Sequence, residues 1–406
     1  MMSDTKPAAA IPYGAYWSTP FARWQGSLAH LHALEFAAHV ARGELERRGI
    51  APAAFDHGVL GTTVPQAQSF YGLPWVMGMI GAERVPGPTI NQACATGVRC
   101  LAAAQQEIAA GDASAVLAIT ADRISNGPHL YYPDPQGMGG TGRAENWVTD
   151  NFSSDPFAKV AMIDTAENVA RRWQITTAEQ HDVVLQRYNQ YDEALADDHA
   201  FQKRYMTLPF AVPDKRFKKQ VGELEGDEGV HPTTAEALVK LTPLKDGGTV
   251  TYGGQTHPAD GNAAIVLTDP ARAAEFSRRP EIDIRIVAFG QARAEPAYMP
   301  FAPVLASKQA LARAGLKIAD MTAVKSHNPF VVNDIVFARE TGCDLGRMNN
   351  YGCSLVWGHP QGPTGLRGVI ELIEELVERG GGHGLFQGCA AGDSSMAVIV
   401  RVSDRA

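Results

Sequence analysis

The stretch at residues 96–99 reads TGVR, and residues 364–367 repeat it as TGLR. Each copy is followed in the sequence by a helical pattern, a glycine and an apolar strand, and these strands are at residues 115–120 and 384–388. A repeated order of helix, glycine and strand predicts two copies of one α/β unit. We therefore expect a duplicated fold whose two halves pack face to face.

Cys94 lies just before the first copy, in the segment NQACATG at residues 91–97. A short strand-forming run precedes it and a helical pattern follows, which predicts a thiol at a helix N-terminus. Backbone N–H groups and the helix dipole favour the thiolate there, so we expect the pKa of Cys94 to lie below its usual value of about 8.5. Gly362 is expected at the equivalent corner of the second copy. A buried structural cysteine is the alternative that this residue alone leaves open.

The bulk properties of the chain restrict its class. It has 406 residues, a formal net charge of −8 and five cysteines. The length exceeds the roughly 250 to 300 residues at which a single core stops growing. The negative charge argues against nucleic acid or an anionic membrane as the main partner. The cysteines match neither a disulfide framework nor Cys-x-x-Cys metal spacing, so we expect a reducing cytoplasm and no metal site. Residues 1–12 lack the pattern of a signal peptide.

Three further segments carry reactive side chains among small residues. His327 lies in SHNPF at residues 326–330, after a strand-forming start. His359 lies in a segment rich in glycine and proline. Cys389 lies in GCAAGD at residues 388–393, a second thiol directly after a predicted strand. Glycines allow the backbone to approach a ligand or another chain segment, and a pure turn role is the competing explanation.

The region at residues 122–245 differs in character from the flanking repeats. It contains a glycine-rich loop and then helical segments, one of which begins at Thr176 with Glu179 three residues later, the pattern of a capping box. This pattern predicts an inserted loop domain. The only dense basic run is KRFKK at residues 215–219. We interpret it as a solvated loop face, with contact to a phosphorylated cofactor as the alternative.

These segments together resemble the thiolases, the acyl-CoA acyltransferases of the thiolase superfamily. The resemblance runs through most of the chain, in the family's order, and includes both thiols. The matching segments are residues 18–23, 91–94, 162–168, 246–251, 260–264 and 358–360, followed by Cys389.

The resemblance implies an α/β fold of duplicated halves, which form a five-layered α-β-α-β-α core with an inserted loop domain. We expect the N-terminal half at residues 1–121, completed by about 246–275. The loop domain is then expected at residues 122–245 and the C-terminal half at 276–406.

The resemblance also implies the chemistry. Cys94 would attack an acyl-CoA thioester and His359 would accept its proton, because a neutral thiol is a poor nucleophile. Cys389 would exchange the α-proton of a second acyl-CoA, while His359 and a group from the corner at His327 stabilise the enolate oxygen. Backbone N–H groups of Cys94 and Ala391 would form the other oxyanion hole. The reaction is a Claisen condensation or, in reverse, thiolysis of a 3-oxoacyl-CoA.

Three positions depart from the usual thiolase pattern. His327 stands where most thiolases have the Asn of Asn-Glu-Ala-Phe. The sterol carrier protein type thiolases also have His there, so that branch is the nearer analogy. Thr256 and His257 stand where the family usually has Ser and Gly. Thr256 keeps a hydroxyl for the pantetheine arm of CoA, whereas the bulk of His257 argues against assigning an acetyl-only substrate.

The resemblance implies CoA and acyl-CoA as substrates and no permanently bound cofactor. It also implies a homodimer or a homotetramer. Some relatives in the His-bearing branch work with a small companion subunit that has a zinc ribbon and an OB-fold, so a partner of this kind is also considered.

Two other functions are open at this stage. Cys94, His327 and His359 also form the Cys-His-His set of ketoacyl synthases, which generate the carbanion by decarboxylation and need no second thiol. The chain is alternatively a non-catalytic subunit with the thiolase fold. The presence of two thiols and two histidines argues against that alternative, because a scaffold has no chemical need for them.

Overall fold

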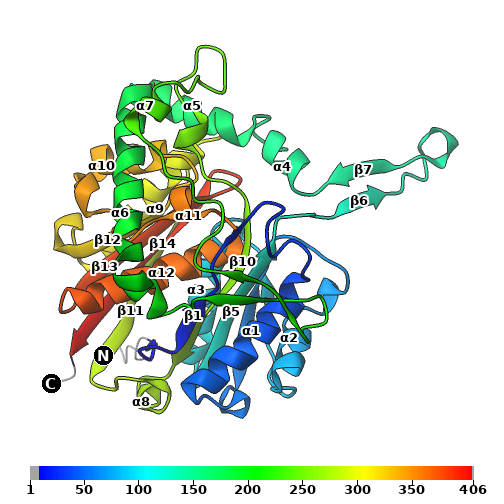
Figure 1. Cartoon of the computed structure of the whole chain (residues 1–406), viewed down its shortest axis with the longest axis vertical. Coiled ribbons are helices and arrows are strands. Elements are labelled where there is room, and N and C mark those ends of the chain that lie inside the picture. Colours follow the sequence, from blue (N-terminus) through cyan, green and yellow to red (C-terminus); the bar gives the residue numbers. More distant parts are fainter. Residues whose placement is uncertain (1–8, 405–406) are drawn as a thin grey trace, which may run out of the picture.

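A six-stranded mixed sheet forms one half of the molecule in a computed structural model that describes residues 9–404 (Figure 1). Residues 1–8 and 405–406, which the predicted terminal segments include, lie outside the described residues. The strands in sheet order are β1 (Tyr16–Ser18), β10 (Ala259–Thr268), β5 (Ala115–Arg123), β3 (His57–Gly61) and β4 (Thr89–Ile90), and β2 (Ala22–Arg23) also pairs with β10.

A four-stranded mixed sheet forms the other half. Its strands in order are β11 (Ile282–Arg293), β14 (Ser394–Asp404), β13 (Gly382–Ala390) and β12 (Met321–His327). Only β12 and β13 run parallel, and the other neighbours are antiparallel. The central strands β5 and β10 are apolar and buried almost throughout, because helices cover both faces of their sheet.

Helices above, between and below the two sheets complete five layers, as Figure 1 shows. The outer layer on the first sheet consists of α1 (Ala33–Arg48) and α2 (Gly72–Ile80). The central layer consists of α3 (Thr96–Ala110) and α12 (Gly362–Glu378). The outer layer on the second sheet consists of α9 (Ala302–Ala314) and α10 (Val332–Thr341). The predicted α-β-α-β-α core of duplicated halves is confirmed.

The two central helices touch at the glycines of the repeated motif. A Cβ atom on Gly97 would lie 2.7 Å from the carbonyl oxygen of Gly362 and 2.8 Å from the backbone N of Leu366. A Cβ atom on Gly365 would lie 3.2 Å from the backbone N of Val98. The motif therefore recurs because the two helix N-termini cross at backbone contact, where a side chain at Gly97 has no room.

The chain between β5 and β10 builds smaller elements around one end of the core. They are the hairpin β6 (His129–Tyr132) and β7 (Arg143–Asn146), the helices α4 (Thr149–Ser153), α5 (Met162–Trp173), α6 (Thr177–Lys203) and α7 (Ala235–Leu238), and the hairpin β8 (Phe210–Pro213) and β9 (Gln220–Leu224). The β6–β7 hairpin projects from the body as an arm (Figure 1). The predicted N-cap is present, since the Thr176 side chain accepts from the N–H of Glu179 at 3.2 Å. The division at residues 121, 245 and 275 stays a prediction.

The remaining α-helices of the described residues are the short α8 (Ala273–Phe276) and α11 (Ser354–Trp357).

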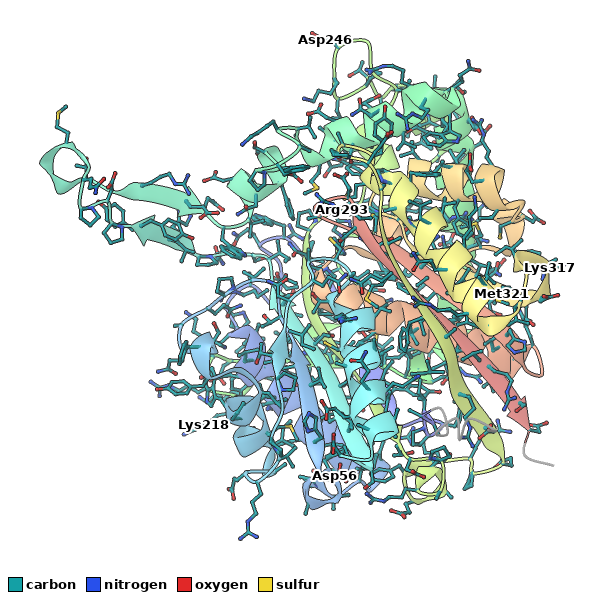
Figure 2. The ribbon with its side chains drawn as sticks, turned by 180° about the vertical axis from the view of Figure 1, so that it is seen from behind. Asp56, Lys218, Asp246, Arg293, Lys317 and Met321 are labelled. Atoms are coloured by element: carbon teal, nitrogen blue, oxygen red, sulfur yellow. The ribbon has the colours of Figure 1, made fainter. Side chains whose placement is uncertain are left out.

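The basic run at residues 215–219 forms the turn of the β8–β9 hairpin. There Phe217 stacks on His39 of α1 with ring centroids 5.0 Å apart. Figure 2 shows Lys218 at the margin of the molecule, beside the N-terminal helices. The four basic residues are exposed, as expected for a solvated loop face.

Membrane insertion has no candidate element in residues 9–404. None of the described helices combines the length and the apolar composition that crossing a bilayer requires.

Candidate active site

Cys94 lies in the turn between β4 and α3, two residues before the helix begins. Ala93 takes a left-handed backbone conformation, with φ of 46°. The backbone N–H of Thr96 donates to the Ala93 carbonyl at 3.0 Å and closes the turn. This tight turn places the Cys94 side chain in the wall of a pocket.

His359 is held through its backbone and one ring nitrogen. Its backbone N–H donates to the carbonyl of His257 at 2.9 Å. Its Nδ1 lies 2.6 Å from the hydroxyl of Thr364, in the first turn of α12. Its Nε2 is buried and has no hydrogen-bond partner within the described residues. This nitrogen is therefore available to a substrate.

His327 is the last residue of β12 and is held in the same way. Its Nδ1 lies 2.8 Å from the hydroxyl of Ser354, the first residue of α11. Its Nε2 is also buried without a partner in the part of the chain that the structure describes. The ring stacks on that of His359, with centroids 4.0 Å apart and planes at 26°. Each histidine thus combines one bonded nitrogen with one available nitrogen.

Three of the four predicted catalytic side chains converge. The sulfur of Cys94 and one ring nitrogen each of His327 and His359 lie within 4.8 Å of one another. Such a set is also a ligand type that Zn²⁺ accepts. A metal binds imidazole in the ring plane, and two stacked rings direct their lone pairs side by side rather than toward one point. The arrangement therefore suits proton transfer and hydrogen bonding to a substrate better than a shared metal.

A pocket of about 380 Å³ opens at these groups. It shares Phe152, Gln255 and Pro258 with a second pocket of about 680 Å³, which extends toward the inserted region. The first pocket is lined mainly by apolar side chains, and its wall includes Cys94, His359, Thr256, Met162, Met299, Phe330 and Ala391. The two cavities adjoin at the three residues that they share, so that together they extend from Cys94 toward the loop region.

Cys389, the second predicted thiol, lies beside this set rather than in it. It is fully buried near the end of β13, and the side-chain N–H of Asn333 donates to its sulfur at 3.3 Å. Burial raises the pKa of Cys389, and a negative charge on Cys94 would raise it further. Cys389 is absent from both the three-group cluster and the pocket wall as described.

The predicted lowering of the pKa of Cys94 is wrong. Burial raises the pKa of Cys94 to about 12, although the backbone N–H groups of Ala391 and Cys94 bond to its sulfur and lower the pKa in part. Desolvation wins because the thiolate loses more hydration than two N–H groups replace. Burial also lowers the pKa of His359 to about 3 and that of His327 well below its usual value. At neutral pH the resting site is a neutral thiol beside neutral imidazoles.

Thr256 and His257 line different pockets. Thr256 lines the pocket at Cys94, but its hydroxyl donates to the backbone carbonyl of Ser354. Its oxygen therefore remains only as an acceptor for a substrate amide. His257 lines the second pocket, with its ring against Gly229 and Gly358. The larger side chain at position 257 does not occupy the pocket at Cys94.

The side chain of Asn328 makes its hydrogen bonds within the protein. Its Nδ2 donates to Asp334 at 2.8 Å and to Cys353 at 3.2 Å. Its Oδ1 accepts from the backbone N–H of Leu355 at 3.1 Å. From this corner, His327 is therefore the side chain that is available to a substrate.

Sequence reasoning missed the polar side chains that hold the predicted groups, namely Ser354, Thr364 and Asn333. The first two lie in the segments that were singled out for their glycines and their repeat, so their hydroxyls were a usable signal. No motif marks Asn333. Asp122 was also missed, and its buried carboxylate accepts from the N–H of Gly362 at 2.9 Å, which ties β5 to the start of α12.

Two family models match the chain in succession. The N-terminal domain of thiolase matches residues 15–271, and the C-terminal domain of thiolase matches residues 281–402. The chain therefore belongs to the thiolase family. It is an acyltransferase of the thiolase type that acts on acyl-CoA thioesters.

Individual relatives agree along almost the full length. An acetyl-CoA acetyltransferase of Allochromatium vinosum is 32% identical over 390 residues, which cover 93% of this chain and 95% of that protein. A beta-ketothiolase of Cupriavidus necator is 28% identical and covers 94% of this chain and 96% of its own. Human mitochondrial 3-ketoacyl-CoA thiolase superposes with a TM-score of 0.88 at 27% identity, covering 98% of this chain and 99% of that structure. A CoA complex of the human enzyme superposes with a TM-score of 0.86.

Proposed function

We propose that this thiolase works through an acyl-enzyme on Cys94, in the pocket of about 380 Å³. The observation that carries the proposal is the convergence of the Cys94 sulfur with one nitrogen each of His327 and His359 within 4.8 Å. Both histidines keep an unbonded Nε2 in the described structure, so both are available to reacting groups.

The first half-reaction forms the acyl-enzyme. The Cys94 sulfur attacks the thioester carbon as His359 takes the thiol proton, and the leaving CoA thiolate is protonated in turn. Because the resting pair is neutral, charge develops during attack rather than before it. The N–H groups of Ala391 and Cys94 bond to the sulfur, which places them near the carbonyl oxygen of the bound acyl group.

The second half-reaction forms the carbon–carbon bond. Cys389 in its thiolate form removes an α-proton from a second acyl-CoA, and the enolate oxygen accepts hydrogen bonds from the imidazoles of His327 and His359. The carbanion attacks the acyl-enzyme carbonyl and releases Cys94 as a thiolate with the 3-oxoacyl-CoA product, and the proton held by Cys389 passes to Cys94, which returns Cys389 to the thiolate. Thiolysis runs through the same groups in reverse. Cys389 is fully buried in the structure, so this step requires the substrate to reach a sulfur behind the pocket wall.

The cavities support a route for CoA. The thioester lies at Cys94, the pantetheine arm passes Thr256, and the nucleotide lies toward the second pocket, which shares three wall residues with the first. His327 in place of the usual Asn supports membership of the sterol carrier protein type branch. Assembly as a homodimer or homotetramer in the cytoplasm, with or without a companion subunit, accompanies this proposal as an expectation from the family.

Separating the two half-reactions tests the proposal. Exchange of labelled CoA into acyl-CoA requires only the acyl-enzyme, whereas condensation requires both steps. Cys94→Ala is expected to abolish both reactions, and Cys389→Ala to retain exchange while losing condensation. Labelled-CoA exchange in Cys94→Ala at the wild-type rate would exclude the proposed nucleophile.

A decarboxylating synthase is the second candidate, because the three converging groups are a Cys-His-His set and Cys389 lies outside it. Full activity of Cys389→Ala with malonyl thioesters would favour that function. Binding of acyl-CoA by the wild-type chain without any CoA exchange would instead favour the non-catalytic subunit.

A further inference from the structure

The hydroxyl of Ser354 lies between three groups of the His327 corner. It is 2.8 Å from Nδ1 of His327 and 3.2 Å from Oδ1 of Asn328, and it accepts the backbone N–H of Asn328 at 3.1 Å. Ser354 is fully buried at the start of α11. A serine hydroxyl has a single hydrogen, so it donates to only one of the two possible acceptors.

The surrounding contacts select one of these acceptors. Oδ1 of Asn328 already accepts the backbone N–H of Leu355 at 3.1 Å, whereas Nδ1 of His327 has only the Ser354 hydroxyl within the described residues. The contact to the ring is also the shorter one. Donation to Nδ1 therefore follows the shorter contact and leaves the amide oxygen with the Leu355 N–H as its donor, and it is the orientation that keeps a proton on Nε2 of His327.

We propose that Ser354 is a positioning residue that donates to Nδ1 of His327 and thereby holds the neutral ring with its proton on Nε2. A neutral imidazole carries one proton, so a ring that accepts at Nδ1 donates at Nε2. That nitrogen is the one without a partner beside Cys94. His327 is thus a fixed hydrogen-bond donor in the resting enzyme rather than a general base.

The two stacked rings then have different roles. This assignment rests on the proposed function, in which the enolate oxygen needs a hydrogen-bond donor. His359 bonds through Nδ1 to Thr364, whose hydroxyl can either donate to that nitrogen or accept a hydrogen bond from it. His359 is therefore free to change its protonation at Nε2 while His327 keeps its donor fixed.

The direct test is the tautomer of His327 in the wild-type chain. Nitrogen NMR of the ¹⁵N-histidine-labelled protein, with His327→Asn used to assign the signal, distinguishes a protonated Nε2 from a protonated Nδ1. We expect the proton on Nε2. A proton on Nδ1 would overturn the inference whether or not the enzyme forms an acyl-enzyme.

Variants of Ser354 supply the kinetic test. Ser354→Ala removes the hydroxyl, and we expect condensation kcat to fall about tenfold to 100-fold with little change in KM, as for loss of an oxyanion donor. Ser354→Thr keeps the hydroxyl and is expected to restore most of this loss. Unchanged kcat in Ser354→Ala, with the protein folded, would overturn the inference.

A third measurement distinguishes failure of the role proposed for Ser354 from failure of the proposed function. Labelled-CoA exchange depends on Cys94 acylation and not on the enolate donor, so Ser354→Ala is expected to keep it. Absence of exchange in the wild-type chain would remove the proposed function itself. Loss of exchange in Ser354→Ala together with condensation would show a merely structural role.

Discussion

The N-termini of α3 and α12 are the same turn used for two purposes. In each, a non-glycine residue with a positive φ precedes the corner, Ala93 with φ of 46° and Gln361 with φ of 56°. In the first copy the corner residue is Cys94, the candidate nucleophile. In the second copy it is Gly362, whose N–H donates to the buried Asp122. The two copies share the backbone geometry of this turn, and the side chain at the corner decides whether the turn carries a reactive group.

The threonines of the repeated motif make different hydrogen bonds in the two copies. The hydroxyl of Thr96 accepts the N–H of Gln92 at 2.8 Å and donates to the Ala93 carbonyl at 2.7 Å. The equivalent of Gln92 in the second copy is Pro360, which has no N–H to donate. The hydroxyl of Thr364 is therefore released to bond the ring of His359 at 2.6 Å. One threonine secures the nucleophile turn and the other orients the base.

The glycines of the motif offer the largest expected effect. We expect Gly97→Ala to destabilise the fold by about 3 kcal/mol, because its Cβ would meet backbone atoms at 2.7 and 2.8 Å. Gly365→Ala is the matched control, since its nearest contact would be 3.2 Å. Urea denaturation of both variants measures the difference. Equal destabilisation would contradict the asymmetric crossing of the two helices.

The pH dependence of Cys94 alkylation tests whether burial or the helix dipole has the larger effect on the pKa of Cys94. A pKa raised to about 12 leaves the thiol protonated at neutral pH, so the thiolate fraction rises with pH up to that value. We expect the iodoacetamide rate at Cys94 to increase about 100-fold between pH 7 and pH 9. Peptide mapping against time measures it. A rate that is already at its plateau at pH 7 would show a preformed thiolate and restore the prediction from the helix N-terminus.

Valine substitutions separate the two threonines. Thr364→Val removes the hydroxyl that orients His359, and we expect a loss in kcat of about tenfold to 100-fold. Thr96→Val leaves the N–H of Gln92 without its acceptor, and we expect a loss of about 1 to 3 kcal/mol in unfolding free energy. Steady-state kinetics and denaturation of both proteins make the comparison. The reverse pattern would contradict the division of roles between the copies.

Asn333→Leu gives the smallest expected effect and concerns the thiol outside the cluster. The substitution adds no charge and removes the N–H donor to Cys389, together with the acceptor that the N–H of Phe330 now binds at 3.3 Å. We expect exchange of the substrate α-proton to slow by about threefold to tenfold, because the Cys389 thiolate loses a hydrogen bond. Deuterium exchange into acyl-CoA measures this rate, with CoA exchange as the control. An unchanged rate would show that Asn333 only packs against the sulfur.

The sequence predicted most of what depends on order along the chain. The repeat at residues 96–99 and 364–367 indicated the duplicated fold, and the motifs around Cys94, His327 and His359 marked three groups that the structure brings together. Their partners were less accessible, because a hydrogen bond such as Asn333 to Cys389 depends on how α10 packs against β13. The pKa of Cys94 was mispredicted since local pattern reveals the helix N-terminus but not the desolvation around it.

The central claim is that Cys94, and not the second thiol, carries the acyl group. Rapid acid quenching of the wild-type chain with labelled acetyl-CoA, followed by peptide mapping, locates the adduct directly. The account predicts one acyl group on the peptide that contains Cys94, both in the wild type and in Cys389→Ala. An acyl group on Cys389, or on any other side chain, would contradict it.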